Sequence, residues 1–226
     1  MDIETTVRER RSIRMFKSDP VPKEIIHQIL EEARWSPSWG NTQPWELYVV
    51  TGEVLERFKR MNRQKCLGGE PHTSEIIMPE FTGPEAWPEI LKKRYADVGK
   101  SVLTSLSIAR EDADARNHYY GDMFNLFGAP CMVLVCLGKS LKVEYAMLDV
   151  GLMMQTICLL AHAKGLGTCM LAASVRYPKL LREILPIPED RVVVIGTAMG
   201  YPDWDSPVNN FERKRAGLEE FVTWLS

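Results

Sequence analysis

The chain has 226 residues, a net charge of −2 and 45% hydrophobic residues, which is the balance of an ordinary globular protein. This composition excludes disorder of the whole chain, and the charge excludes a polycation that acts on nucleic acid or membranes. The cysteines, five in number, include no CxxC pair, which argues against a disulfide framework and a metal site and favours a reducing, cytoplasmic compartment. The most apolar stretches, 129–137 and 150–161, are shorter than the roughly 20 residues of a membrane span, so we expect no membrane partner.

The hydrophobic pattern predicts helices first and then strands that are separated by helices. Helical spacing and capping residues predict helices at 2–11, from Pro22 to just before Pro37, at 53–61, within 84–109, at 144–164 and at 179–185. β-rich or continuous apolar runs predict strands at 45–51, 131–137, 168–172 and 191–200. Residues 110–120 are highly charged and predicted to be solvated. The order predicts an α+β fold with a central, mostly antiparallel or mixed sheet, in a single domain that spans 1–226.

The predicted helix at 144–164 is apolar nearly all round between Val150 and Ala161. Such a helix is buried either in a core or in an interface between subunits. GLGTCM at 165–170, which follows it, lacks the third glycine of a dinucleotide fingerprint and comes after a helix instead of a strand. These glycines are therefore interpreted as a helix cap and a turn.

A first basic segment, RERRSIRMFK at 8–17, has five basic residues and one acidic residue. Arginine offers a planar fork of donors that matches phosphate oxygens, and Ser12 adds a hydroxyl and a backbone N–H. A solvated, basic helix end is the plain alternative. Arg213-Lys-Arg215 forms a second basic segment near the C-terminus, and a charged surface is the alternative there.

The loop SPSWGNTQPW at 36–45 separates a predicted helix from a predicted strand. Its glycine and prolines are typical of a turn. Ser38, Asn41 and Gln43 place three polar side chains close together in that loop, a pattern that can fix the edge of a polar heterocycle.

Taken in order, RRSIRMF, SPSWGNTQPW, GLGTCMLAA, VVVIGTAMGYP and ERKR make the chain resemble the FMN-dependent nitroreductase family over nearly its whole length. The resemblance implies a nitroreductase-like fold and a homodimer with FMN at the subunit interface, with the helix 144–164 in the dimer core. Residues 62–125 match poorly, and in the family this region is a variable, lid-like excursion that shapes substrate access.

The resemblance also implies which residues bind FMN. Arg10 and Ser12 match positions that hold the phosphate, Arg11 lies beside them, and Arg213 and Arg215 match a basic pair that closes on the phosphate. Arg14 matches a position near the ribityl chain and the pyrimidine edge. Four loop residues match positions that reach the flavin from the other subunit: Ser38, Trp39, Asn41 and Gln43. The end of the strand near flavin N5 and O4 is matched by Leu171, Ala172 and Ala173.

No side chain is expected as a catalytic acid or base, because the hydride moves at flavin N5. The implied activity is an oxidoreductase that uses NAD(P)H to reduce nitroaromatics, quinones or related acceptors by a ping-pong mechanism, with NADH and NADPH both open as donors. The alternatives are reductive dehalogenation, enone reduction or flavin destruction on the same scaffold, a non-catalytic flavin-binding module, and a basic N-terminus that binds nucleic acid. Tyr120 and Phe124, beside the variable region, either pack in the core or line the substrate cleft.

Overall fold

The computed structural model describes residues 2–76 and 86–226, and its centre is a four-stranded sheet in the order β1-β2-β4-β3. The strands are β1 (Trp45–Thr51), β2 (Cys131–Gly138), β4 (Arg191–Gly200) and β3 (Gly167–Leu171), and each neighbouring pair is antiparallel. The predicted α+β fold with an antiparallel sheet is therefore confirmed.

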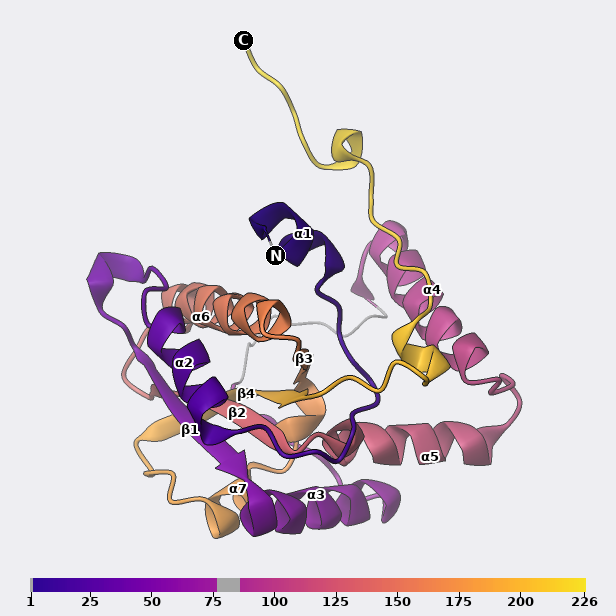
Figure 1. The fold of residues 1–226 in the computed structure, drawn as a ribbon, viewed down its shortest axis with the longest axis horizontal. Coiled ribbons are helices and arrows are strands. Elements are labelled where there is room, and N and C mark those ends of the chain that lie inside the picture. Colours follow the sequence, from indigo (N-terminus) through magenta and orange to yellow (C-terminus); the bar gives the residue numbers. More distant parts are fainter. Residues whose placement is uncertain (1, 77–85) are drawn as a thin grey trace.

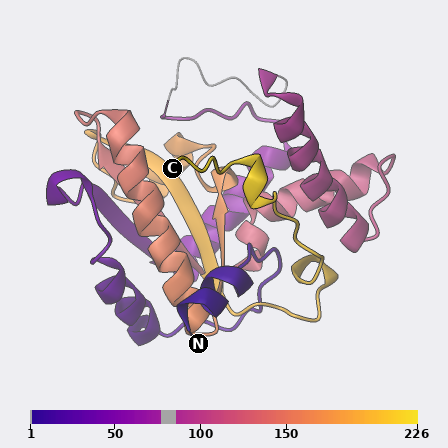
Figure 2. The ribbon, with the colours of Figure 1, turned by 90° about the horizontal axis from the view of Figure 1, so that it is seen from above.

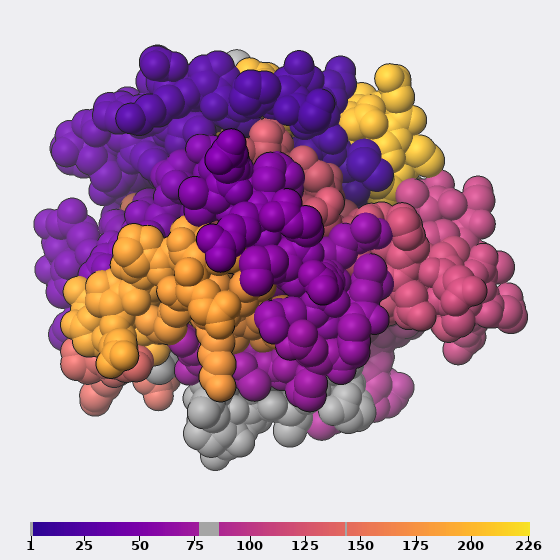
Figure 3. Space-filling view, turned by 90° about the horizontal axis from the view of Figure 1, so that it is seen from below, coloured from indigo at the N-terminus to yellow at the C-terminus, as the bar shows by residue number. Residues whose placement is uncertain are grey.

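Helices cover both faces of this sheet (Figures 1 and 2). Because side chains alternate along a strand, Cys131, Val133 and Val135 of β2 face one helical layer, and Met132 and Leu134 face the other. The first layer holds α2 (Lys23–Ala33) and α6 (Val143–Ala163), and the second holds α3 (Gly52–Leu67), α5 (Ala113–Phe124) and α7 (Pro178–Ile184). Figure 3 shows the second layer from outside, with α3 between the segments that contain α7 and α5. The remaining helices are α1 (Ile3–Glu9) and α4 (Glu89–Ser105).

The helices of the variable region extend beyond the prediction. The third helix does not end at residue 61 but continues to Leu67. Residues 110–120 are mostly exposed, as predicted, but from Ala113 on they also belong to α5, which the sequence did not predict and whose first turn is capped by Asp112 through the backbone N–H of Ala115. Gly121 allows this charged helix to approach α3, since a Cβ there would lie 3.1 Å from Leu67. Residues 77–83 of the predicted excursion lie outside the described residues. The same is true of residues 84–85, which begin the region 84–109 in which helix was predicted.

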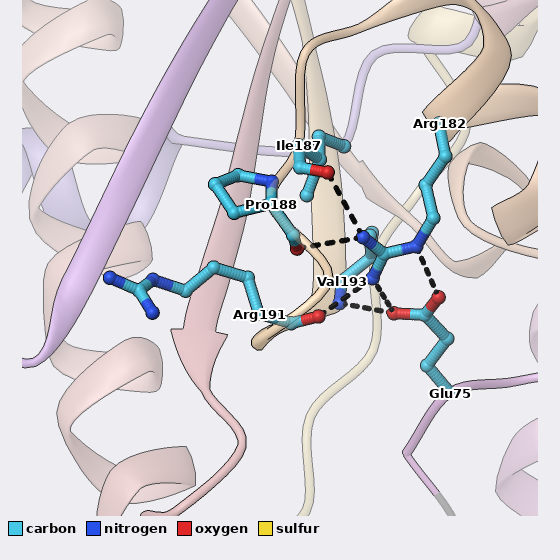
Figure 4. A network of polar contacts seen from close by, with 6 residues as sticks. All are labelled: Glu75, Arg182, Ile187, Pro188, Arg191 and Val193. Carbon is cyan, nitrogen blue, oxygen red and sulfur yellow. Dashed lines mark hydrogen bonds and ion pairs between the residues drawn. The ribbon is translucent and has the colours of Figure 1, made fainter.

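A network of polar contacts fastens the segment that precedes residue 77 to the rest of the fold (Figure 4). The Glu75 carboxylate accepts hydrogen bonds from Arg182 Nε at 2.9 Å and from the Val193 backbone N–H at 2.8 Å. Arg182 also donates to the backbone carbonyls of Ile187 and Pro188. Burial alone would raise the pKa of Glu75, but the hydrogen bonds and the charge of Arg182 outweigh it and lower that pKa.

Helix α6 confirms the predicted helix at 144–164 and extends well beyond its most apolar stretch, 150–161. Within it, Glu144–Ala163 has 20 residues and a mean hydropathy of 1.5, which is long and apolar enough for a membrane span. This corrects the expectation that every apolar stretch is too short for one. The core helix of a soluble protein has the same length and composition, and the inward face of α6 packs on the sheet and α2. Its outward face leaves Tyr145, Leu148 and Leu152 exposed.

Candidate functional site

The first basic segment lies flat against the edge strand β3. Ile13 is buried, its backbone N–H donates to the Thr168 carbonyl at 3.0 Å, and Ser12 forms an isolated parallel bridge with Thr168. The absence of a side chain at Gly167 makes this close contact possible, because a Cβ there would lie 2.5 Å from Ile13 Cγ1. The contact with β3 fixes the backbone from which Arg10, Arg11 and Arg14 extend.

The C-terminal segment closes over the first basic segment. Asn209 is fully buried, its Oδ1 accepts from the Arg14 backbone N–H at 2.7 Å, and its Nδ2 donates to the Met15 carbonyl at 2.8 Å. Arg213 donates to the backbone carbonyls of Arg8 and Arg10. Two basic segments that are about two hundred residues apart in the sequence thus meet, as Figure 1 shows for the indigo and yellow ends of the chain.

Positive charge accumulates where these segments meet. Burial and the nearby charges of Arg213 and Arg14 lower the pKa of Arg11. Burial and the charges of Arg215 and Arg10 likewise lower the pKa of Arg213, which Glu9 opposes only in part. An open groove of about 670 Å³ adjoins the cluster and is lined by Ile3, Glu4, Val7, Arg8, Arg213 and Arg215. A bound anion would relieve the repulsion, so the cluster fits a phosphate group.

The loop 38–43 is a tight and exposed structure. Gly40, Asn41 and Gln43 all have positive φ, of 57°, 56° and 49°. Such φ values are uncommon for residues other than glycine and mark a strained loop. Ser38 Oγ accepts from the Gln43 backbone N–H at 2.9 Å, and the Trp39 backbone N–H donates to the Asp149 carboxylate at 3.0 Å. The loop is thereby attached to α6.

Within one chain, the structure does not bring this loop to the cationic cluster. Asp149, to which the loop is attached, precedes His162 by 13 residues on the same helix, which corresponds to about 20 Å along its axis. His162 lines a small cavity together with Arg10 and Arg11. The two groups of predicted FMN residues therefore lie toward opposite ends of α6.

The predicted residues Leu171, Ala172 and Ala173 form the end of β3 and the turn after it. Leu171 and Ala173 are buried, whereas Ala172 is exposed. Asn62, which is fully buried, holds this turn by donating from Nδ2 to the Ala173 carbonyl at 3.1 Å. This hydrogen bond fixes the backbone of the turn.

The two candidates for the substrate cleft differ in exposure. Tyr120 is 52% exposed on α5, whereas Phe124 is 8% exposed and packs on Tyr177 with the ring centroids 5.8 Å apart.

Near the cluster, burial raises the pKa of the Cys169 thiol to about 11, so this thiol is protonated at neutral pH. The described residues contain no group of three or more side chains suited to hold a metal ion.

Sequence reasoning missed the residues that organise the cluster and the turn at 171–173. Asn209, Phe211 and Asn62 carry no charge and belong to no motif, so nothing in the sequence distinguished them from ordinary loop or helix residues. Only the fold shows that Asn209 and Phe211 lie against the first basic segment.

Comparisons with known proteins bear on the fold and the family of this chain. A model of the nitroreductase family matches residues 7–201. A 4-nitrobenzoate reductase of Nocardioides sp. (strain LMS-CY) is 32% identical to this chain, and the match covers 97% of this chain and 88% of the relative. A chloronitrobenzene nitroreductase of Comamonas testosteroni is 34% identical, and the match covers 99% of this chain and 96% of the relative. The crystal structure of the FMN- and NADPH-dependent nitroreductase NfnB from Sphigopyxis sp. strain HMH superposes with a TM-score of 0.93 at 28% identity and covers 100% of both chains. The expected fold is confirmed, and the chain belongs to the nitroreductase family.

Proposed function

We propose that this protein is an FMN-dependent oxidoreductase that uses NAD(P)H to reduce nitroaromatic compounds or related acceptors. The observation that carries the proposal is the cationic cluster, in which two distant arginine segments converge with few acidic neighbours. A phosphate with nearly two negative charges supplies the missing counter-charge. The curated relatives reduce nitroaromatic substrates by name, and the NfnB relative depends on FMN and NADPH, which favours NADPH as the donor.

Each group of residues has a distinct role in this proposal. Arg10, Ser12 and Arg215 bind the phosphate, and Arg14 lies toward the ribityl chain and the pyrimidine edge. Bound FMN supplies the carrier for the two electrons, and the chain itself binds and orients it. The turn at 171–173, which Asn62 holds, would lie near the flavin. No catalytic acid or base is needed among the side chains.

The proposal includes a homodimer in which the loop 38–43 acts on the partner's FMN. Trp39, Tyr145, Leu148 and Leu152 leave an exposed apolar surface along the outward side of α6, where Trp39 packs on Tyr145 at 5.7 Å between ring centroids. Apolar surfaces of this kind mark interaction sites. A second copy would bring Ser38, Trp39, Asn41 and Gln43 to the cluster that they cannot reach within their own chain.

The electron donor and the acceptor would use one cleft in turn, which is a ping-pong mechanism. Tyr120, more than half exposed on α5, is the side chain we assign to that cleft. The five free cysteines fit a reducing compartment, and we place the protein in the cytoplasm.

The test is reconstitution with FMN. Purified protein is stripped of flavin, and FMN and riboflavin are titrated by quenching of flavin fluorescence. We expect FMN to bind at least about tenfold tighter than riboflavin, because charge-assisted hydrogen bonds to the phosphate are worth about 1.5–3 kcal/mol each. Equal affinity for the two flavins, or no binding of either, would overturn the proposal.

A further inference from the structure

The arginines of the cluster differ in how far their guanidinium donors are already bonded to the protein. The Arg213 guanidinium donates to two backbone carbonyls, those of Arg8 and Arg10, so both of its terminal nitrogens already have a protein partner. Among the described residues, nothing accepts a hydrogen bond from the Arg10 guanidinium, and Arg215 donates only to the Lys214 carbonyl next to it. Arg10 and Arg215 therefore keep donors for a ligand, whereas Arg213 is committed to the protein.

Phe211 provides a second tie between the segments. The guanidinium carbons of Arg11 and Arg14 lie 5.2 Å and 5.7 Å from the centre of its ring, which is the geometry of a cation–π contact. The Phe211 carbonyl also accepts a hydrogen bond from Arg11. One aromatic ring thus holds two like-charged side chains that would otherwise move apart.

These contacts form a clasp, which we define as residues 209–213 in contact with residues 8–15. The clasp comprises the Asn209 bonds to the backbone of Arg14 and Met15, the Phe211 ring under Arg11 and Arg14, and the fork of Arg213. Its parts bind the backbone or support a neighbouring side chain, and none of them needs a ligand to be satisfied.

We propose that this clasp holds the first basic segment in the shape that receives the cofactor phosphate, and that Phe211 and Arg213 are positioning residues in it and not phosphate ligands. The inference rests on the proposed function, since it assigns roles within the same site. It divides the predicted phosphate residues into two groups: Arg10 and Arg215 contact the phosphate, and Arg213 maintains the place of Arg10.

The test compares charge-conserving and ring-removing variants in flavin-free and FMN-loaded protein. Arg213→Lys keeps the charge but loses the fork that spans two carbonyls. Phe211→Leu removes the ring, Phe211→Tyr retains it, and Phe221→Leu removes an exposed ring further along the same segment as a matched control. Arg10→Ala removes a free guanidinium. Hydrogen exchange is measured for residues 8–16 in flavin-free protein, and FMN and riboflavin affinities are measured for each variant.

We expect Arg213→Lys and Phe211→Leu to speed exchange in residues 8–16, including the Arg14 amide bound by Asn209, and to lower the affinity for FMN relative to riboflavin by about tenfold. Phe211→Tyr and Phe221→Leu should match the unchanged protein in both measurements. Unchanged exchange in Arg213→Lys and Phe211→Leu would overturn the clasp, whatever their affinity for FMN. Arg10→Ala should lose FMN affinity without faster exchange; if it keeps full FMN affinity, the proposed phosphate site fails while the clasp stands.

Discussion

The close fit between Gly167 and Ile13 gives the sharpest prediction about how the site is built. In Gly167→Ala, the new Cβ would lie 2.5 Å from Ile13 Cγ1 and 2.9 Å from Pro202 Cγ. Ile13 cannot move away freely, because it is 2% exposed and its backbone N–H is bonded to Thr168. The first basic segment must therefore lift from β3, or β3 must shift.

Overpacking of this kind costs about 1–3 kcal/mol. For a chain of this size, each kcal/mol lowers Tm by about 2–4 °C, so we expect a decrease of about 2–12 °C in flavin-free protein. Because the displaced segment carries Arg10, Ser12 and Arg14, FMN affinity should decrease as well, by about tenfold or more.

The assay is thermal and urea unfolding of flavin-free protein, followed by FMN titration. Gly99→Ala is the control, because nothing lies within 4 Å of a Cβ at this helical position in α4, and it should raise stability by about 0.5–1 kcal/mol. Ile13→Ala in the Gly167→Ala background removes Cγ1, so the two changes should couple favourably by about 1 kcal/mol. If Gly167→Ala leaves both the free energy of unfolding and the FMN affinity unchanged, the close contact of the segment with β3 is refuted.

Three further predictions concern other parts of the molecule. Glu75→Gln should lower the free energy of unfolding by about 1–3 kcal/mol at neutral pH. Because the folded pKa of Glu75 lies below its ordinary value of 4.5, the difference from the unchanged protein should shrink below pH 4.5 and disappear as pH falls through the folded pKa. Urea unfolding that shows the same difference at neutral pH and in acid would contradict this. Leu148→Arg, on the outward face of α6, should convert a dimer into a monomer in sedimentation experiments and abolish FMN binding, whereas an unchanged mass would argue against α6 as the interface. At neutral pH, iodoacetamide should label Cys66 before the other four cysteines, which are buried; early labelling of Cys169, whose thiol pKa is raised to about 11, would be inconsistent with its burial.

The sheet was the most predictable part of the fold. The strands at 45–51 and 191–200 have the predicted bounds, because their runs of β-branched and apolar residues end at turn-forming residues. Helix α5 was missed for a physical reason: its sequence is charged and only weakly amphipathic, and it is held by the capping Asp112 and by contacts at Gly121 and Phe124. Such contacts depend on where α3 lies, which local sequence does not specify.

For the site, the resemblance implied that the two basic segments meet, and the structure places them against each other. Arg10 and Arg213 belong to motifs that stand out by charge, and the structure brings them into contact, while their role in holding FMN stays a prediction. Asn209 and Phe211 could not be found from the sequence, because a buried amide and a half-buried ring acquire their roles only from long-range packing. The loop 38–43 remains apart from the cluster in one chain, since its partner in our proposal is a second copy.

The most direct test of the proposed function is an anaerobic titration of the FMN-loaded protein, followed in the visible spectrum. We expect NADPH to bleach the oxidised flavin band stoichiometrically, and 4-nitrobenzoate or a quinone, added after the donor is spent, to restore it. A flavin band that neither NADPH nor NADH bleaches, or a reduced flavin that neither acceptor reoxidises, would contradict the assignment of this protein as a nitroreductase-type enzyme.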